Sequence, residues 1–508
     1  MKYLLGLDQG TSGTKAYLMD FAGNRVGLGY VPTELIRLRP DWIEQDPRAV
    51  AAGAAQAIEQ ALRAARCAPS DVAAIGLASQ RGTDFIWDAR SAQPVANAIT
   101  WQDLRTLPLI EELETWEHAH ERRYRLGYFP GPWCASMHLA WRARHQPEFQ
   151  AVLHDEHVRI GMSAGWLIAA LGRPSQHLHD YSLTQKTGLW DFRRGAYWTE
   201  WIDRLQLSLS GLPNPAPTLD DYGMLRLGDG SRAADVPIVA MIGDQQAALF
   251  GHGCRHAGHA ECTHGTASFV NVVAGDTPPE LDNINVYHAW SLPHPAPGAQ
   301  PSAIQHTYCL EADTTVTGAA VRWMLQRGHW FESEAQLDAS AESVADAGGV
   351  IVVPAFTGLN VPYNDHDARA TILGLALGSD RAHVARAFLD SIGYQLRAIL
   401  ETIHDRTGLQ VEQLSVGGGL SNSDIACQIQ ADRLGIPLVR PGEKETTARG
   451  AALLAGLGLG VWKAIDDLPP LPEGSTYFEP RLSADQRDLD YGRWQHAVRH
   501  VRELGENI

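Results

Sequence analysis

The chain has 508 residues, of which 44% are hydrophobic and 20% charged, and its formal net charge is −17 at pH 7. This length allows two or three domains with full-sized cores, and the composition excludes a disordered or fibrous protein. The negative charge argues against a general nucleic-acid binder, which would carry basic patches, but local N–H groups can still hold an anionic ligand.

The sequence contains no recognisable membrane segment or secretory signal. The N-terminal apolar run is interrupted by a charged residue too early for a signal peptide. The apolar, glycine-rich stretch 451–462 is too short to span a bilayer. The six cysteines are scattered without a C-x-x-C pair, which suits free thiols in a reducing compartment. We therefore expect a cytoplasmic protein without a membrane or nucleic-acid partner.

A glycine-rich turn follows the first predicted strand. Residues 3–8 have the pattern of a buried strand, and residues 15–21 that of its hairpin partner. The turn between them carries two glycines and three hydroxyl side chains, so it presents N–H and O–H groups with little bulk. Such a turn can approach a phosphate, although a plain β-hairpin turn has the same composition.

Two polar clusters come next, after a predicted helix at 46–66 that opens on Asp-Pro and a predicted strand at 72–79. The first cluster is residues 80–84, ahead of a further predicted strand at 85–88, and the second is residues 101–105. Both are candidates to hydrogen-bond a hydroxylated substrate. The alternative is a pair of surface ion pairs, which are common and contribute little free energy. A helix is predicted at 136–145.

A lone carboxylate stands at the end of the strand predicted from the apolar run 237–243. Asp244 follows the glycine that ends this run, and residues 246–250 favour a helix. In parallel α/β sheets ligands bind where strands end and helices begin, so Asp244 is a candidate to touch a substrate, with Gln245 beside it. The alternative is that Asp244 caps the helix by accepting backbone N–H bonds.

The second half of the chain repeats the first turn. Residues 263–273 again lead from a Gly-Thr turn into a β-rich run, which indicates duplicated domains that face each other across a phosphate. Helices are predicted at 318–326, from a cap at Ser379 or Asp380 to Gly408, and at 423–434. Three glycines follow the predicted strand at 411–416 and precede the last of these helices, and this order of strand, glycine turn and helix is typical of phosphate binding. The spacings of the P-loop and Rossmann motifs are absent.

Six histidine and cysteine residues lie between positions 252 and 264. Imidazole and thiolate side chains that close in sequence can bind zinc. However, their spacing matches no usual zinc-ligand pair, and glycines make the segment a loop that leads to the second Gly-Thr turn. We therefore do not expect a metal site here.

With these residues assembled, the chain resembles the FGGY carbohydrate kinases over nearly its whole length. The blocks that carry the resemblance are residues 6–11, 243–251, 354–359 and 445–452, and they occur in the family's order. The resemblance implies two actin-like (ribonuclease H-like) α/β domains with an interdomain cleft. We expect a sugar-binding N-terminal domain at residues 1–247 and an ATP-binding C-terminal domain at residues 248–508.

The resemblance also implies roles for single residues. Asp244 would be the catalytic base, and Asp8 would be the carboxylate beside Mg²⁺, which binds with ATP. The substrate would contact Arg81, Trp101, Asp103, Trp133 and Gln245. The nucleotide would contact Thr11, Ser12 and Lys15 in the first turn, Gly265 and Thr266 in the second, and Gly318, Gly418 and Gly419.

Departures from the family pattern bear on the substrate. The glycerol kinase branch has a glutamate where this chain has Gly82, and a substrate-contacting tyrosine where it has Trp133. The lost carboxylate would leave glycerol hydroxyls unpartnered and make room for a longer substrate, which favours a xylulokinase that makes xylulose 5-phosphate. The xylulokinase branch, however, has a Met-His pair where this chain has Arg81-Gly82.

The alternatives remain open at this point. Glycerol phosphorylation is the first, and an actin-like or chaperone-like ATPase that switches partners is the alternative from another class. The ATPase would share the two Gly-Thr turns but would not need the polar clusters around a small pocket. A small sugar or polyol is the expected partner, and a homodimer is an expectation that the sequence leaves open.

Overall fold

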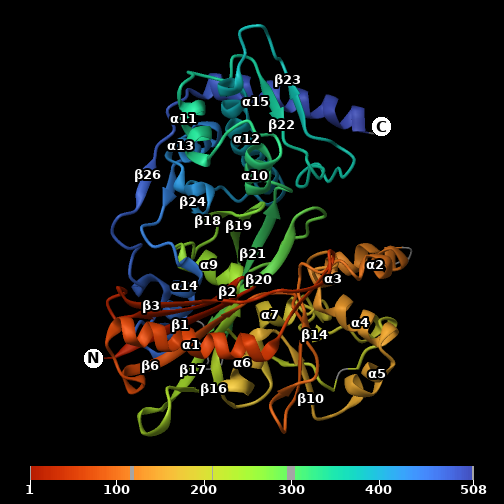
Figure 1. The fold of residues 1–508 in the computed structure, drawn as a ribbon, viewed down its shortest axis with the longest axis vertical. Coiled ribbons are helices and arrows are strands. Elements are labelled where there is room, and N and C mark those ends of the chain that lie inside the picture. Colours follow the sequence, from red (N-terminus) through yellow and green to blue (C-terminus); the bar gives the residue numbers. More distant parts are fainter. Residues whose placement is uncertain (1, 115–118, 209, 294–303, 506–508) are drawn as a thin grey trace.

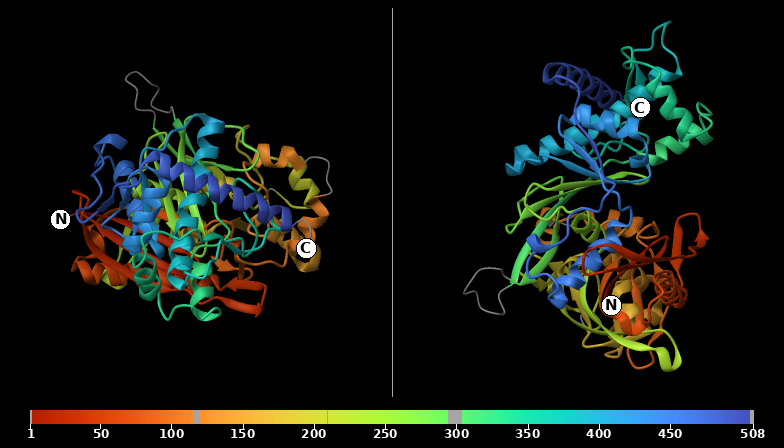
Figure 2. Two further views of the ribbon diagram at one scale, coloured as in Figure 1. Left: turned by 90° about the horizontal axis from the view of Figure 1, so that it is seen from above. Right: turned by 90° about the vertical axis from the view of Figure 1, so that its left-hand side faces the viewer.

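Two lobes stack along the long axis of the molecule in the computed structural model, which describes residues 2–114, 119–208, 210–293 and 304–505 (Figure 1). Each lobe is built on a seven-stranded mixed sheet. Figure 2 shows the lobes joined by a narrower waist, with the N-terminus on the lower lobe and the C-terminal helix on the upper one. Across the described ranges, every helix falls short of the length and apolarity that crossing a bilayer requires.

The lower lobe contains the first sheet and the start of the chain. Strands β1, β2 and β3 form an antiparallel meander, and β6 and β17 run parallel to β1. Helix α1 (Pro47–Ala65) packs on β2 and β3 and begins with an Asp46 cap, as predicted. In spatial order the strands are β11 (Gly172–Pro174), β16 (Leu219–Leu227), β17 (Ala234–Gly243), β6 (Val72–Ser79), β1 (Tyr3–Gly10), β2 (Gly13–Met19) and β3 (Arg25–Pro32).

The upper lobe repeats this plan. Strands β18, β19 and β21 are antiparallel neighbours, whereas β24 and β25 run parallel to β18. In both sheets a Gly-Thr turn therefore joins the first strand to its antiparallel partner, and the predicted duplication is confirmed. In spatial order the strands are β20 (Asn285–Pro293), β21 (Ile304–Asp313), β19 (Ser268–Gly275), β18 (Ala260–His264), β24 (Leu414–Gly418), β25 (Leu438–Arg440) and β26 (Thr476–Phe478).

The helices of the upper lobe follow local sequence signals closely. The side chain of Asp380 caps α12 (Arg381–Thr407) and Gly408 ends it in the left-handed conformation, both as predicted. Ser423 caps α13 (Asp424–Leu434), which packs on α12. The remaining helices are α10 (Gly318–Gln326), α11 (Glu334–Glu342) and α15 (Ala484–Gly505), and a short hairpin is formed by β22 (Ile351–Val353) and β23 (Thr371–Leu373).

A region rich in short helices lies beside the first sheet, to the right of the lower lobe in Figure 1. Its helices are α2 (Leu107–Glu114), α3 (Ala119–Leu126), α4 (Ala135–His145), α5 (Pro147–His154), α6 (Ser163–Leu171), α7 (Tyr181–Gln185) and α8 (Thr199–Arg204). Its strands are β7 (Phe85–Asp88), β8 (Gln93–Pro94), β10 (Val158–Gly161), β12 (Leu178–Asp180), β13 (Trp190–Asp191), β14 (Ala196–Tyr197) and β15 (Asn214–Ala216); β4 (Ile36–Arg39), β5 (Trp42–Gln45) and β9 (Ala98–Ile99) pair separately.

One helix from the second half of the chain joins the first lobe. Helix α14 (Thr446–Leu459) packs on β1, β6, β17 and α9 (Asp244–Gly251), and its apolar side chains belong to the core of the lower lobe. The backbones of α9 and α14 meet at glycines, since a Cβ added to Gly450 would lie 1.9 Å from the Ala247 carbonyl oxygen. The division of the chain at residue 247 stays a prediction, and α14 belongs to the second half of the chain although it packs in the first lobe.

Candidate active site

Asp244 lies where strand β17 ends, as the first residue of α9. The N-cap position belongs to Gly243, so the helix-cap alternative is wrong for Asp244. Asp244 Oδ1 accepts a hydrogen bond of 2.9 Å from the Gln245 backbone N–H, and the side chain remains 25% exposed. Burial raises the pKa of this carboxyl, while the nearby Arg81 guanidinium opposes the rise. The carboxylate is therefore largely enclosed, and it lies close enough to Asp8 to raise the pKa of that carboxyl.

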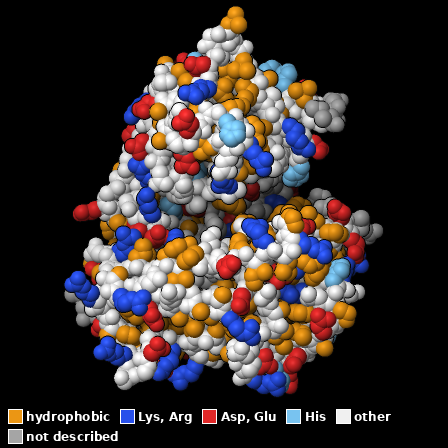
Figure 3. Space-filling view, in the orientation of Figure 1, with side chains coloured by type: hydrophobic (Ala, Val, Ile, Leu, Met, Phe, Trp, Pro, Cys, Tyr) orange, Lys and Arg blue, Asp and Glu red, His pale blue; other side chains and the backbone are white. Residues whose placement is uncertain are grey.

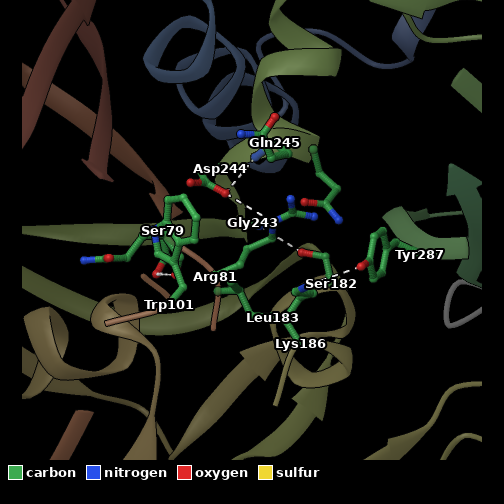
Figure 4. A network of polar contacts seen from close by, with 12 residues as sticks. Ser79, Arg81, Trp101, Ser182, Leu183, Lys186, Gly243, Asp244, Gln245 and Tyr287 are labelled. Carbon is green, nitrogen blue, oxygen red and sulfur yellow. Dashed lines mark hydrogen bonds and ion pairs between the residues drawn. The ribbon is translucent and has the colours of Figure 1, made fainter. Parts of the chain in front are cut away.

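Arg81, two residues beyond the end of β6, is paired with two carboxylates. Its Nη2 donates a hydrogen bond of 2.6 Å to Glu311 Oε2, and its Nε lies 3.4 Å from Asp244 Oδ1. The third nitrogen, Nη1, is buried and has no hydrogen-bond partner among the residues that the structure describes. Figure 4 shows Arg81 beneath Asp244 and beside Trp101. An unpaired guanidinium N–H at this place is available to a ligand hydroxyl.

Asp8, near the end of β1, is the second acid of the site. Its side chain is 9% exposed, and burial raises the pKa of its carboxyl to about 7. Lys15 opposes this rise in pKa, whereas the carboxylates of Asp244 and Glu445 add to it. Lys15 itself is ion-paired with Glu445, which directly precedes α14. A carboxyl so placed would gain from a bound cation that favours its ionised form.

The two Gly-Thr turns line one cleft of about 820 Å³. Thr11, Ser12 and Lys15 contribute from the lower lobe, and Thr266 contributes from the upper lobe. Figure 3 shows the surface hollowed between the two lobes. Trp101 also lines the cleft, and its indole Nε1 donates a hydrogen bond of 2.6 Å to Thr11 Oγ1. The structure therefore connects a predicted substrate residue directly to the first turn.

The glycines predicted to border the nucleotide gather around the second turn. The Gly318 N–H donates to the Gly265 carbonyl at 3.1 Å, and the Thr317 N–H donates to the Thr266 carbonyl at 2.9 Å. The Gly419 N–H donates to the His264 carbonyl at 2.9 Å. Gly418 has a φ of 82°, and a Cβ there would lie 2.3 Å from the same carbonyl oxygen. Only glycine fits this approach of β24 to the turn.

The predicted substrate residues differ in whether their polar atoms are free to bind a ligand. Asp103 is fully buried, and its oxygens accept bonds from Arg105 at 2.8 and 2.9 Å and from the Ile43 N–H at 2.6 Å. With both oxygens occupied, Asp103 holds the turn after Trp101, and these contacts do not support a substrate-binding role. Gln245 keeps a buried Oε1 to which no described residue donates a hydrogen bond, so it has an acceptor to offer.

Gly82 leaves no extra room beside Trp133. Its φ is 78°, and a Cβ added there would lie 2.1 Å from the Trp133 carbonyl oxygen and 3.4 Å from the Trp101 Cβ. The expectation that losing a side chain at position 82 enlarges the pocket is therefore wrong, because the backbone at Trp133 fills that space. The Trp133 side chain is 46% exposed, on the same side as Trp101 and Gly82.

Family models match both halves of the chain. The N-terminal domain of the FGGY family of carbohydrate kinases matches residues 3–251, and the C-terminal domain of that family matches residues 260–459. The chain belongs to this family. It is therefore a carbohydrate kinase, a phosphotransferase that uses ATP.

Relatives at similar length are glycerol kinases. The chain is 33% identical to the glycerol kinase of Deinococcus radiodurans over 503 residues, which covers 99% of this chain and 98% of the relative. It is 36% identical to the glycerol kinase of Paracidovorax citrulli over 505 residues, with 99% of both chains covered. The expectation of a xylulokinase has less support from these relatives than the glycerol alternative.

Solved structures of the family have the same fold. The glycerol kinase of Plasmodium falciparum, crystallised with ADP, superposes with a TM-score of 0.89 at 25% identity, covering 99% of this chain and 98% of that chain. A xylulose kinase from Brucella ovis superposes with a TM-score of 0.85 at 25% identity, covering 99% of this chain and all of that chain. These matches confirm the predicted pair of actin-like α/β domains.

Three residues that surround Arg81 in the structure were not found from the sequence. Glu311 is on β21, Tyr287 is on β20, and Lys186 follows α7; Lys186 Nζ lies 3.2 Å from the Tyr287 hydroxyl. Burial, and then Arg81, lower the pKa of Lys186 to about 8. Glu311 could have been found, because a glutamate within an otherwise apolar run is rarely buried without a partner. The sequence pattern around Lys186 and Tyr287 contains no signal that would predict their place beside Arg81.

Two of the histidines in the segment 252–264 form hydrogen bonds inside the upper lobe. His252 Nδ1 lies 2.7 Å from Ser415 Oγ, and His264 bonds Ser268 and Gln430 at 2.8 and 2.9 Å. Within the ranges that the structure describes, no three His, Cys, Asp or Glu side chains are grouped so that they could hold a metal ion by themselves.

Proposed function

We propose that this kinase transfers the γ-phosphoryl group of ATP to a terminal hydroxyl of a small polyol, with Asp244 as the general base. The observation that carries this proposal is the partly exposed Asp244 carboxylate beside a cleft that both Gly-Thr turns line. Phosphoryl transfer depends on positioning and charge neutralisation rather than on covalent chemistry. Asp244 accepts the proton of the substrate hydroxyl and orients the oxygen for in-line attack.

The two turns and the helix start beside them are the proposed site for the phosphates of ATP. Thr11 and Ser12 offer hydroxyls and backbone N–H groups from the lower lobe, with the ammonium of Lys15 beside them. Across the cleft, Gly265 and Thr266 are bonded to the first residues of α10, whose N-terminus carries partial positive charge. We propose that Gly318, Gly418 and Gly419 border the nucleotide on this side.

Asp8 is the residue that fits a magnesium ion in this proposal. Its carboxyl has a pKa raised to about 7 by burial, with Asp244 nearby, and carboxylate oxygens are ligands that Mg²⁺ prefers. A bound Mg²⁺ would supply positive charge that neutralises the phosphate oxygens. Among the chain's own residues, Lys15 favours the ionised form of Asp8 and so helps to keep this carboxylate ready for the ion.

Glycerol is the substrate we propose first, because the relatives above are glycerol kinases over their full length. The free Nη1 of Arg81 and the free Oε1 of Gln245 can serve as donor and acceptor for its hydroxyls. A ketose such as xylulose is the second candidate, and the B. ovis structure supports keeping it. Trp101 and Trp133 would then contact the substrate carbons.

ADP release with a substrate panel tests this proposal. The panel is glycerol, erythritol, xylulose, ribulose and gluconate, each compared with ATP alone. We expect glycerol to stimulate ADP release most strongly. ATP consumption that ignores every polyol and sugar would refute the proposal and favour an ATPase that switches partners.

Assembly and location stay predictions. A homodimer is compatible with the expectations above, and light scattering on the purified chain, with and without ATP, measures its mass directly. A cytoplasmic location is the remaining expectation, and fractionation of cells that express the chain tests it.

A further inference from the structure

We propose that Glu311 is a positioning residue: it holds the guanidinium of Arg81 away from Asp244, so that the Asp244 carboxylate stays free to act as the base. The inference rests on the proposed function, because it assigns a task to a residue that supports the proposed base. It concerns one cation that two carboxylates share.

The two carboxylates hold Arg81 unequally. The contact between Arg81 Nη2 and Glu311 Oε2, at 2.6 Å, is short for a charge-assisted hydrogen bond. The contact between Arg81 Nε and Asp244 Oδ1, at 3.4 Å, lies beyond the range of such a bond. Glu311 takes the strong bond. Among the described residues, Asp244 Oδ1 accepts a hydrogen bond from the Gln245 N–H alone, and a quarter of the Asp244 side chain stays exposed.

Glu311 acts from the other lobe. Arg81 follows β6 of the first sheet, whereas Glu311 belongs to β21 of the second sheet, and Tyr287 lies on the neighbouring strand β20. The Arg81 guanidinium carbon lies 5.4 Å from the centre of the Tyr287 ring, within the range of a cation–π contact. Two adjacent strands of the upper lobe thus fix a guanidinium that belongs to the lower lobe.

Without the Glu311 charge, Arg81 has a ready alternative partner. Its Nε already lies near Asp244, and the loss of the Glu311 charge would release Nη2, so a small rotation would give a bidentate pair of Nε and Nη2 with Asp244. Such a pair favours the ionised carboxylate and weakens it as a base. The other charged or titratable groups that act on Asp244 would be unchanged; they are Lys186 after α7, Asp8 on β1 and, beside Asp8, the pair of Lys15 with Glu445.

The first test is the pH profile of Glu311→Gln, which keeps the shape and an acceptor oxygen. The acid limb of kcat/KM reports the base in the free enzyme, and we expect it to move about one pH unit lower. We expect kcat to fall roughly tenfold because the base is weaker, and KM for the polyol to rise because Arg81 leaves its position. Glu311→Asp restores the charge and should bring the limb back toward that of the wild type.

A double variant shows whether Glu311 acts through Arg81. In the Arg81→Gln background we expect Glu311→Gln to cause no further fall in kcat, because the shared cation is already gone. The matched control is Asp390→Asn, which breaks the buried 2.8 Å pair of Asp390 with Arg433 in the upper lobe, remote from the cleft. It should lower the melting temperature without moving the acid limb.

A titration without turnover keeps this inference separate from the proposed function. The ¹³C carboxyl signal of Asp244, assigned with Asp244→Asn, should titrate at lower pH in Glu311→Gln than in the wild type. If the signal and the acid limb stay in place, or if the effects of the two substitutions simply multiply, the inference is wrong. If no polyol stimulates the wild type, the proposed function fails while the carboxyl titration still decides the role of Glu311.

Discussion

Replacing Asp244 by alanine separates its role as a base from a structural role. A positioned general base contributes roughly 10²- to 10⁴-fold to a rate, which corresponds to about 3–5 kcal/mol of activation free energy. The cost in stability should be much smaller. The carboxylate is 25% exposed, and Arg81 keeps its 2.6 Å bond to Glu311 when Asp244 is gone. We expect the free energy of unfolding to change by less than about 1 kcal/mol.

The matched control is Asp380→Ala, which removes a true helix cap. Asp380 accepts bonds from the Ala382 and His383 N–H groups at the start of α12, so its loss should cost about 1 kcal/mol of stability and leave turnover unchanged. The assay is ADP release with saturating ATP and the best polyol of the panel, beside urea unfolding of both variants. If Asp244→Ala keeps more than about a tenth of the wild-type kcat, the assignment of the base is refuted.

Three further results are expected. Trp101→Phe removes the 2.6 Å bond to Thr11, so KM for ATP and for the polyol should both rise about fivefold, measured by steady-state kinetics. Gly82→Ala must adopt a φ of 78° with its Cβ against the Trp133 carbonyl, so we expect a loss of more than about 1 kcal/mol in urea unfolding. Asp8 has a pKa raised to about 7, so its ionisation costs the folded, nucleotide-free protein stability above pH 7. Asp8→Asn should therefore be more stable than the wild type at pH 8, and this advantage should disappear as the pH falls from 7 toward 4; an advantage that grows in acid would contradict the reasoning.

Features set by neighbouring residues could be predicted from the sequence. The residues directly before and after helix α12 are its N-cap Asp380 and the glycine Gly408 that ends it, so both helix ends could be predicted from the sequence. The two Gly-Thr turns were recognisable because each one leads into a β-rich run, and the fold repeats them in equivalent positions. The strand predicted at 411–416 begins only at Leu414, an error of the size that hydrophobic patterns usually give at strand ends.

Features set by contacts between distant residues could not be predicted. Arg81 and Glu311 are 230 positions apart, and no local pattern pairs them. Asp103 looked like a ligand-binding acid in a polar cluster, but the backbone of Ile43 and the side chain of Arg105 use its oxygens. The same limit explains the pocket beside Gly82, because only the fold brings the Trp133 carbonyl against it.

The block at 445–452 helped to identify the family, and the packing of α14 supplies a physical reason for its composition. Helix α9, which begins at Asp244, meets α14 backbone to backbone, since a Cβ at Gly251 would lie 1.9 Å from the Thr446 carbonyl oxygen. Glu445, directly before α14, pairs with Lys15 beside Asp8. One helix from the second half of the chain therefore fixes both acids of the site. Its glycines and alanines are required because larger side chains would push α9, and Asp244 with it, out of line with the first turn.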